Sequence, residues 1–313
     1  MTAELPKVTR TYQNHTLDST RWQRYQPRAG DIVIATSYKS GTTWMQEIVR
    51  QLIFLGQDVP ERDRVSVKQI SPWLEHPGVP VDEVLNKLET QQHRRFLMCH
   101  IPLDGLPFFP QMHYIVVGRD ARDVAMSLWN HYDGMVDSLF KNPNSLERQD
   151  VAPLPPPPQD IHAFWHQWIT RGWFAWEREG YPFYGNLHHT QSWWNYRHLP
   201  NILFVHYNDL KADLAGEIRQ IADFLGIAVD DTLLPSLLQT VSLDVMRERE
   251  ERLKPPLLTV LKNGANTFFY KGTNGRWRDV LSTDELQLYE AKAAEVLTPD
   301  CRAWLEQGRQ AGL

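Results

Sequence analysis

DIVIATSYKSGTTW, residues 31–44, decides how this chain folds. The β-branched run at 31–36 predicts a short buried strand, and the polar stretch at 37–43 predicts a loop. The segment WMQEIVRQLIFL, residues 44–55, carries apolar side chains at helical spacing and predicts a helix. A strand, a loop and a helix in direct succession indicate an α/β unit.

Three further apolar runs predict strands of the same sheet, at residues 95–101, 113–117 and 201–207. Each run is too uniformly apolar for a half-exposed edge strand, so buried parallel strands fit best. Helical patterns follow at 121–131 and at 212–225, where Gly226 stands in the helix-stop position. We therefore expect an α/β fold with one doubly wound, mainly parallel sheet, helices on both faces, and ligands at the carboxyl ends of the strands.

The composition limits the class of protein. The chain has 313 residues, 42% hydrophobic and 23% charged, which favours a single globular domain over residues 1–313. A formal net charge of −5 gives no general attraction to nucleic acid or to anionic membranes, so we expect no nucleic-acid partner. Only Cys99 and Cys301 are present, which excludes a disulfide framework and a cysteine-rich metal site and indicates a reducing compartment.

The amino-terminal segment has no apolar core of the signal-peptide kind. The longest apolar runs elsewhere fall far short of the roughly 20 residues that a spanning helix needs. We therefore expect a cytoplasmic protein without integral membrane association.

Two segments allow two interpretations each. Between residues 133 and 160 the periodic patterns stop and the chain reaches PLPPPP at 153–158, which predicts either a lid-like loop or a surface insertion. The tryptophans crowded between Trp165 and Trp194 fit either core packing or the lining of an apolar pocket.

The loop at residues 38–44 has the composition of a phosphate-binding, P-loop-like segment. Backbone N–H groups at a helix N-terminus attract an anion, Gly41 lets the main chain come close, and Lys39 adds charge. Hydroxyl groups come from Ser40, Thr42 and Thr43. The first glycine of the Gly-x4-Gly-Lys-Ser/Thr pattern is missing and the lysine precedes the glycine, which disfavours a magnesium–nucleoside triphosphate site. The alternative is a structural turn that is merely polar.

This loop resembles the 5′-phosphosulfate-binding loop of the cytosolic sulfotransferases, which use 3′-phosphoadenosine 5′-phosphosulfate (PAPS). The family pattern is Tyr-Pro-Lys-Ser-Gly-Thr-Thr-Trp, and this chain lacks the proline. The resemblance implies that residues 39–43 bind the phosphosulfate and that Trp44 stacks on the adenine.

Two further segments resemble the motifs of that family. VGRDARDVAMS, residues 117–127, is similar to its 3′-phosphate motif, which implies that Arg119 and Ser127 are ligands. FYKGTNGRW, residues 269–277, resembles its Arg-Lys-Gly-x-x-Gly-x-Trp segment, which covers the cofactor through Lys271 and Gly272. Tyr270 stands where the family has an arginine.

The segment MCHIPL, residues 98–103, resembles the family's Lys-Thr-His-Leu-Pro and implies that His100 is the catalytic base. Met98 replaces the lysine of that motif, so Lys39 would carry more of the charge stabilisation. Tyr207 is similar to the tyrosine that contacts the adenine. Trp73 and His189 are similar to residues of the acceptor pocket. Without this context a lone histidine is more often structural.

The matched segments follow the family's order from residue 31 to residue 277. The resemblance implies in-line transfer of a sulfuryl group from PAPS to the hydroxyl of a small acceptor, without a metal. Two alternatives are a small-molecule kinase that needs Mg²⁺ and a non-catalytic protein that binds PAPS. The sequence identifies neither the acceptor nor the oligomeric state, although the tryptophan-rich segment favours an apolar or aromatic alcohol.

Overall fold

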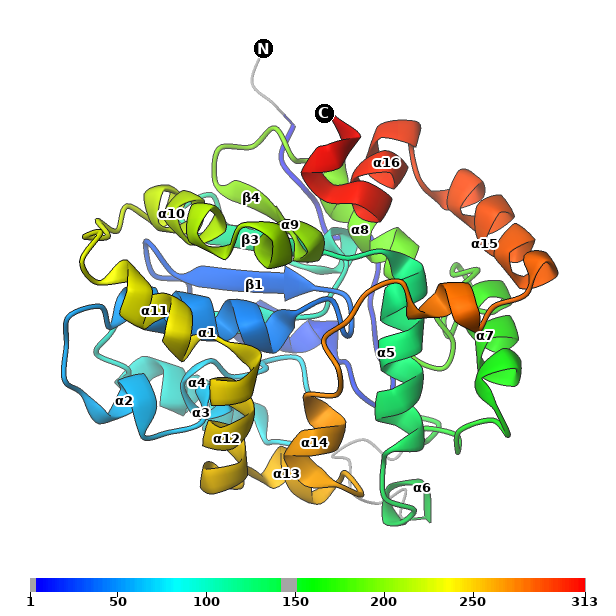
Figure 1. Ribbon diagram of the computed structural model, residues 1–313, viewed down its shortest axis with the longest axis horizontal. Coiled ribbons are helices and arrows are strands. Elements are labelled where there is room, and N and C mark those ends of the chain that lie inside the picture. Colours follow the sequence, from blue (N-terminus) through cyan, green and yellow to red (C-terminus); the bar gives the residue numbers. More distant parts are fainter. Residues whose placement is uncertain (1–3, 142–150, 313) are drawn as a thin grey trace.

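Four short strands form the centre of the molecule (Figure 1). The computed structural model describes residues 4–141 and 151–312. Its strands are β1 (Ile32–Thr36), β2 (Phe96–Cys99), β3 (His113–Gly118) and β4 (Ile202–His206). They pair in parallel in the order β2-β1-β3-β4. The predicted parallel sheet and its strands are confirmed.

The side chains of β1 alternate between two hydrophobic cores. Ile32 and Ile34 belong to one cluster, and Val33 and Ala35 belong to the other. All of them are fully buried, because helices cover both faces of the sheet. Burial on both faces explains why the strand is a continuous apolar run with no polar alternation.

Each face of the sheet has its own set of helices. The cluster around Ile32 and Ile34 includes α1 (Thr42–Ile53), α3 (Val67–Ile70), α9 (Tyr207–Ala212), α10 (Leu214–Leu225) and α11 (Leu234–Thr240). The opposite cluster includes α4 (Val81–Thr90), α5 (Ala121–Asp133), α7 (Ile161–Thr170), α8 (Asn186–Trp194), α15 (Thr283–Val296) and α16 (Pro299–Gln307). The doubly wound prediction is therefore confirmed.

A third, smaller cluster joins α12 (Leu243–Leu253), α13 (Pro256–Thr259) and α14 (Gly264–Phe268), which lie together at the bottom of the view in Figure 1. Two further helices, α2 (Pro60–Asp63) and α6 (Ser138–Lys141), are single turns. Short 3₁₀ turns occupy Ser19–Arg24, Leu103–Gly105, Arg276–Asp279 and Gly308–Ala311.

The predicted helix at 212–225 corresponds to α10, which begins two residues later, at Leu214. Asp213 lies between α9 and α10, and its carboxylate accepts a hydrogen bond of 2.9 Å from the Gly216 amide. This side-chain cap fixes the start of α10 at Leu214. Gly226 ends α10 with a φ of 67°, as its helix-stop position predicts.

The two ambiguous segments have different outcomes. Trp165, Trp168 and Trp193 are at most 1% exposed, so these three belong to the core. Within the segment 133–160, residues 142–150 lie outside the described residues. The Tyr132 hydroxyl donates to the carbonyl of Pro155, which ties the proline run to α5.

The helices of residues 4–141 and 151–312 include none with the length and apolarity that crossing a bilayer requires. Cys99 and Cys301 are both free thiols and both buried.

Candidate active site

The residues singled out in the sequence gather along one edge of the sheet, where the parallel strands end. The loop at 37–41 follows β1, and His100 directly follows β2. Arg119 follows β3, and Tyr207 follows β4. Because the strand order is β2-β1-β3-β4, these groups stand in a row: the histidine, the loop, the arginine and the tyrosine. This is the edge at which open α/β sheets bind their ligands.

The loop after β1 exposes the N-terminus of α1 to a ligand. Gly41 has a φ of 110°, Lys39 has a φ of 63°, and no described side chain caps the helix. The hydroxyls of Ser40 and Thr42 face inward instead, at 2.7 Å from Ser37 Oγ and 2.6 Å from Thr36 Oγ1. The free helix amides therefore stay available for an anion.

The ammonium of Lys39 has no acceptor among the described residues. Its Nζ lies 5.1 Å from the centre of the Phe268 ring. Burial, together with the nearby charges of Arg119 and Lys68, lowers the pKa of Lys39 to about 7. A partly buried cation beside other cations requires a negative charge, which an anionic ligand would supply.

His100 is 4% exposed and is held in one orientation. Its Nδ1 lies 2.7 Å from the carbonyl oxygen of Thr36, which can only accept, so Nδ1 carries the hydrogen. The Nε2 lone pair is therefore free, with no hydrogen-bond partner among the described residues. Its backbone amide donates to Glu75 Oε1 at 2.6 Å. Burial lowers the pKa of His100 to about 3, and the bond to Thr36 opposes that shift, so the imidazole is neutral at physiological pH.

Aromatic rings surround this histidine. The ring centres of Tyr38 and Trp73 lie 4.6 Å and 5.0 Å from that of His100. Tyr184 lies between His100 and His189, at 6.4 Å and 6.2 Å from their ring centres. The Nε2 of His189 is buried and finds no partner among the described residues. Burial holds the pKa of His189 well below its usual value. Both predicted acceptor residues are thus on the His100 side of the edge.

Arg119 joins three segments of the chain. Its guanidinium donates to the Lys39 carbonyl at 3.0 Å, to the Thr273 carbonyl at 3.1 Å and to Asn274 Oδ1 at 2.8 Å. It also lies 4.3 Å from the centre of the Tyr207 ring. Arg119 thereby holds the loop at 37–41 and the segment at 269–277 next to each other. The resemblance to the family implies that both segments bind the same cofactor.

Tyr207 and Trp44 form the far end of the row. Their rings meet edge to face at 5.5 Å, and the Tyr207 hydroxyl donates to the Gly272 carbonyl at 3.4 Å. Gly272 has a φ of 60°, and its neighbour Lys271 is exposed. The predicted adenine side is therefore assembled from three distant segments.

Ser127 and Thr43 are less closely connected. Ser127 lies on α5 and Thr43 on α1, each partly exposed and without a hydrogen bond to the other predicted residues. Arg276 approaches this side, because its guanidinium lies 3.5 Å from the Met126 carbonyl and 4.9 Å from the Tyr270 ring centre.

Two cations at this edge were not assigned from the sequence. Arg276 lies inside the 269–277 motif and could have been noticed as a basic residue close to the departure at Tyr270. Lys68, whose Nζ lies 3.5 Å from Met98 Sδ, comes from the four-residue helix α3 and carries no sequence signal. Among the described residues, no group of three or more histidine, cysteine, aspartate or glutamate side chains could hold a metal ion.

A parallel α/β sheet with an anion-binding loop at the topological centre of its carboxyl edge defines a nucleotide-binding protein of the P-loop-like class. The chain belongs to the sulfotransferase family, because the model of the sulfotransferase domain matches residues 29–297.

Related proteins agree with that assignment. The glycolipid sulfotransferase of Mycobacterium bovis is 34% identical over 99% of this chain and 98% of its own length. Sulfotransferase 1A1 of Rattus norvegicus is 28% identical over 89% of this chain and 88% of its own. The structure of mouse sulfotransferase SULT7A1 complexed with PAP shares the fold with a TM-score of 0.66, at 19% identity over 91% of this chain and 90% of that one. Retinol dehydratase in complex with androsterone and inactive cofactor PAP gives 0.64, at 23% identity over 88% and 82%.

Proposed function

We propose that this protein transfers the sulfuryl group of PAPS to the hydroxyl of a small, apolar or aromatic acceptor, with His100 as the base. The whole chain would serve as one transferase domain. Its two buried free thiols are compatible with the reducing cytoplasm.

The observation that carries the proposal is the orientation of His100 beside the anion loop. Thr36, the last residue of β1, accepts the Nδ1 hydrogen of His100, and the loop begins one residue later. The free Nε2 lone pair and the anion-binding amides of α1 are thus held by the same short stretch of chain. A base held next to an anion site can take the proton of a hydroxyl while that hydroxyl attacks the bound anion. This arrangement favours transfer of a group from the anion to the hydroxyl.

The chemistry follows from that arrangement. The acceptor oxygen forms a bond to sulfur, the bond between sulfur and the 5′-phosphate oxygen breaks, and the hydroxyl proton passes to Nε2 of His100. Lys39 and the loop amides stabilise the negative charge that develops on the departing phosphate oxygen. Arg119 with Ser127 would bind the 3′-phosphate, and Lys271 with Gly272 would cover it.

The nucleotide fits this edge in one direction. Trp44 and Tyr207 offer aromatic faces to the adenine at the β4 end, and the phosphosulfate reaches the loop after β1. The sulfuryl group then lies toward β2, where His100 and the rings of Tyr38 and Trp73 stand. These rings support an apolar or aromatic acceptor. Because relatives at 34% identity are named glycolipid sulfotransferases, an acceptor sugar on a lipid belongs among the candidates.

A direct test is transfer of ³⁵S-sulfate from labelled PAPS to phenols, sterols, sugars and glycolipids. We expect labelled product that persists when EDTA removes Mg²⁺. A requirement for Mg²⁺ and a nucleoside triphosphate would instead support the small-molecule kinase. Tight PAPS binding with no transfer to any acceptor class would support the non-catalytic binding protein.

A further inference from the structure

The side chain of Lys68 reaches the site from outside all the matched motifs. Its Nζ donates to Gln46 Oε1 at 2.8 Å and lies 3.5 Å from the sulfur of Met98. It forms no ion pair with any described carboxylate. Its Nζ also lies 5.9 Å from the centre of the Phe268 ring, the ring that Lys39 approaches to 5.1 Å. Two ammonium groups therefore approach one ring, and neither forms an ion pair with a carboxylate of the described residues.

Compared with Lys39, Lys68 approaches the Phe268 ring from the side of β2 and His100. Met98, which it contacts, lies in β2 and precedes His100 by two residues. The strand segment at Met98 pairs with Trp73, whose ring packs against His100. Lys68 is thus placed at the β2 end of the edge, where the sulfuryl group would lie.

The charge of Lys68 also affects the pKa values of its neighbours in the site. Burial lowers the pKa of Lys68 to about 8, although the Glu250 carboxylate opposes that shift. The charge of Lys68 lowers the pKa of His100 more than the charge of Lys39 does. The pKa of Lys39, in turn, responds more to Arg119 than to Lys68. Lys39 and Lys68 therefore both lie close enough to His100 to affect its pKa.

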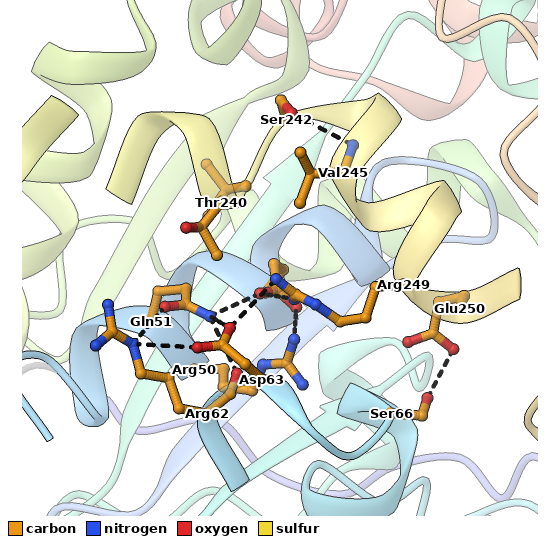
Figure 2. A network of polar contacts seen from close by, with 12 residues as sticks. Arg50, Gln51, Arg62, Asp63, Ser66, Thr240, Ser242, Val245, Arg249 and Glu250 are labelled. Atoms are coloured by element: carbon orange, nitrogen blue, oxygen red, sulfur yellow. Dashed lines mark hydrogen bonds and ion pairs between the residues drawn. The ribbon is translucent and has the colours of Figure 1, made fainter. Parts of the chain in front are cut away.

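A buried network fixes the helix that carries Lys68. Figure 2 shows Ser66, which caps α3, and its hydroxyl donates to Glu250 on α12 at 2.8 Å. Arg50, on α1, donates to the Val65 carbonyl at 2.7 Å. A single helical turn held at its start by two longer helices can present one side chain in a fixed place.

We propose that Lys68 binds the sulfuryl end of PAPS, supplying from α3 the positive charge that β2 lacks at Met98. The inference rests on the proposed function. The Lys68 ammonium donates hydrogen bonds to the non-bridging sulfuryl oxygens while sulfur passes from the phosphate oxygen to the acceptor oxygen. It keeps its proton, and the hydroxyl proton still goes to His100.

The test compares two ligands that differ only in the sulfuryl group: PAPS and adenosine 3′,5′-bisphosphate. Isothermal calorimetry without acceptor measures both affinities. For Lys68→Met we expect an affinity for PAPS about 10- to 150-fold weaker, the loss typical of one charged hydrogen bond, and an affinity for the bisphosphate within about threefold. Lys87→Met, at an exposed site on α4, is the matched control and should change neither affinity.

Two further variants separate charge from packing. Lys68→Arg keeps the charge and should stay within about tenfold of the wild-type PAPS affinity. Lys68→Met combined with Met98→Lys moves the ammonium onto the strand and should recover PAPS binding. Equal losses for both ligands in Lys68→Met, or as large a loss in Lys68→Arg, would overturn the inference. A wild-type protein that binds neither ligand would overturn the proposed function instead.

Discussion

His100 combines a fixed tautomer with an unpartnered nitrogen, and its replacement separates chemistry from binding. We expect His100→Ala to lower the single-turnover rate of sulfuryl transfer by about 100- to 10,000-fold, the usual contribution of a general base. The affinity for adenosine 3′,5′-bisphosphate should stay within a few fold, because the proposed base would face the acceptor and not the phosphates. Wild-type rates in the folded variant would show that His100 is structural.

Lys39 and Arg119 are the proposed ligands of the two phosphate groups. Lys39→Ala and Arg119→Ala should each weaken binding of the bisphosphate by about 1.5 to 3 kcal/mol, because each removes a charged contact. Arg119→Ala also breaks the bonds to Thr273 and Asn274, so its melting temperature should fall more than that of Lys39→Ala. Calorimetric titration measures the affinities. Unchanged affinity in both variants would remove the nucleotide from this edge.

The lowered pKa of Lys39 makes anion binding depend on pH. In the free protein its pKa of about 7 means that the ammonium loses its proton as the pH rises past neutrality. A bound anion restores the proton, so binding at pH 8 should be accompanied by proton uptake and should weaken as the pH rises. Below about pH 6 that uptake should vanish. Calorimetry in buffers of different ionisation enthalpy counts the protons, and Lys39→Ala should reduce the number at pH 8.

At the scale of single elements, the turn between β1 and α1 depends on one glycine. A Cβ on Gly41 would lie 3.0 Å from Tyr207 Cδ2, and its φ of 110° disfavours any side chain. Gly41→Ala should therefore displace the loop and weaken binding of the bisphosphate at least tenfold. Gly56→Ala is a matched control, since its φ is 73° and a Cβ there meets nothing within 4 Å. Equal affinities in the two variants would contradict a close approach at Gly41.

Elements with a strong pattern could be predicted from the sequence, and short ones could not. The four strands were predictable because burial on both faces requires continuous apolar runs. Helix α3 has four residues, too few for a hydrophobic period, so the position of Lys68 depends on tertiary contacts with α1 and α12. Arg119 and His100 were identified because motifs surround them. The sequence alone could not show that Lys68 and Met98 would touch, since their contact joins two separate elements.

At the scale of the whole molecule, a buried ion-pair network links the anion loop to the carboxy-terminal part of the chain. Glu47, on α1, pairs with Arg50 of the same helix and with Arg249 of α12. Arg247, also on α12, donates to the Phe269 carbonyl at 3.0 Å, at the start of the segment that closes over Arg119. Helix α12 thus contacts both α1 and the segment at 269–277.

Removal of the shared carboxylate should therefore destabilise the fold. Glu47→Gln removes the carboxylate that pairs with both Arg50 and Arg249 and leaves Arg249 with its 3.3 Å pair to Asp63. Because a buried guanidinium that loses its partner is costly, we expect a loss of about 3 to 5 kcal/mol in the free energy of unfolding. Glu295→Gln is the control, because it breaks an ion pair with Lys292 on α15 in which the Glu295 side chain is 53% exposed. It should lower the free energy of unfolding by less than about 1 kcal/mol. Urea denaturation measures both. Similar losses in the two variants would mean that the buried network adds no more than a surface pair.

The order of the strands has a consequence for how such a protein diversifies. His100 follows β2, the outermost described strand on that side, while the proposed nucleotide ligands in the loop at 39–43, Arg119 and Tyr207 follow β1, β3 and β4. Under the proposed function, changes in the loops around β2 would alter the choice of acceptor and leave the proposed donor ligands in place. One donor site could accordingly be combined with different acceptor sites, through changes at the β2 end of the sheet alone.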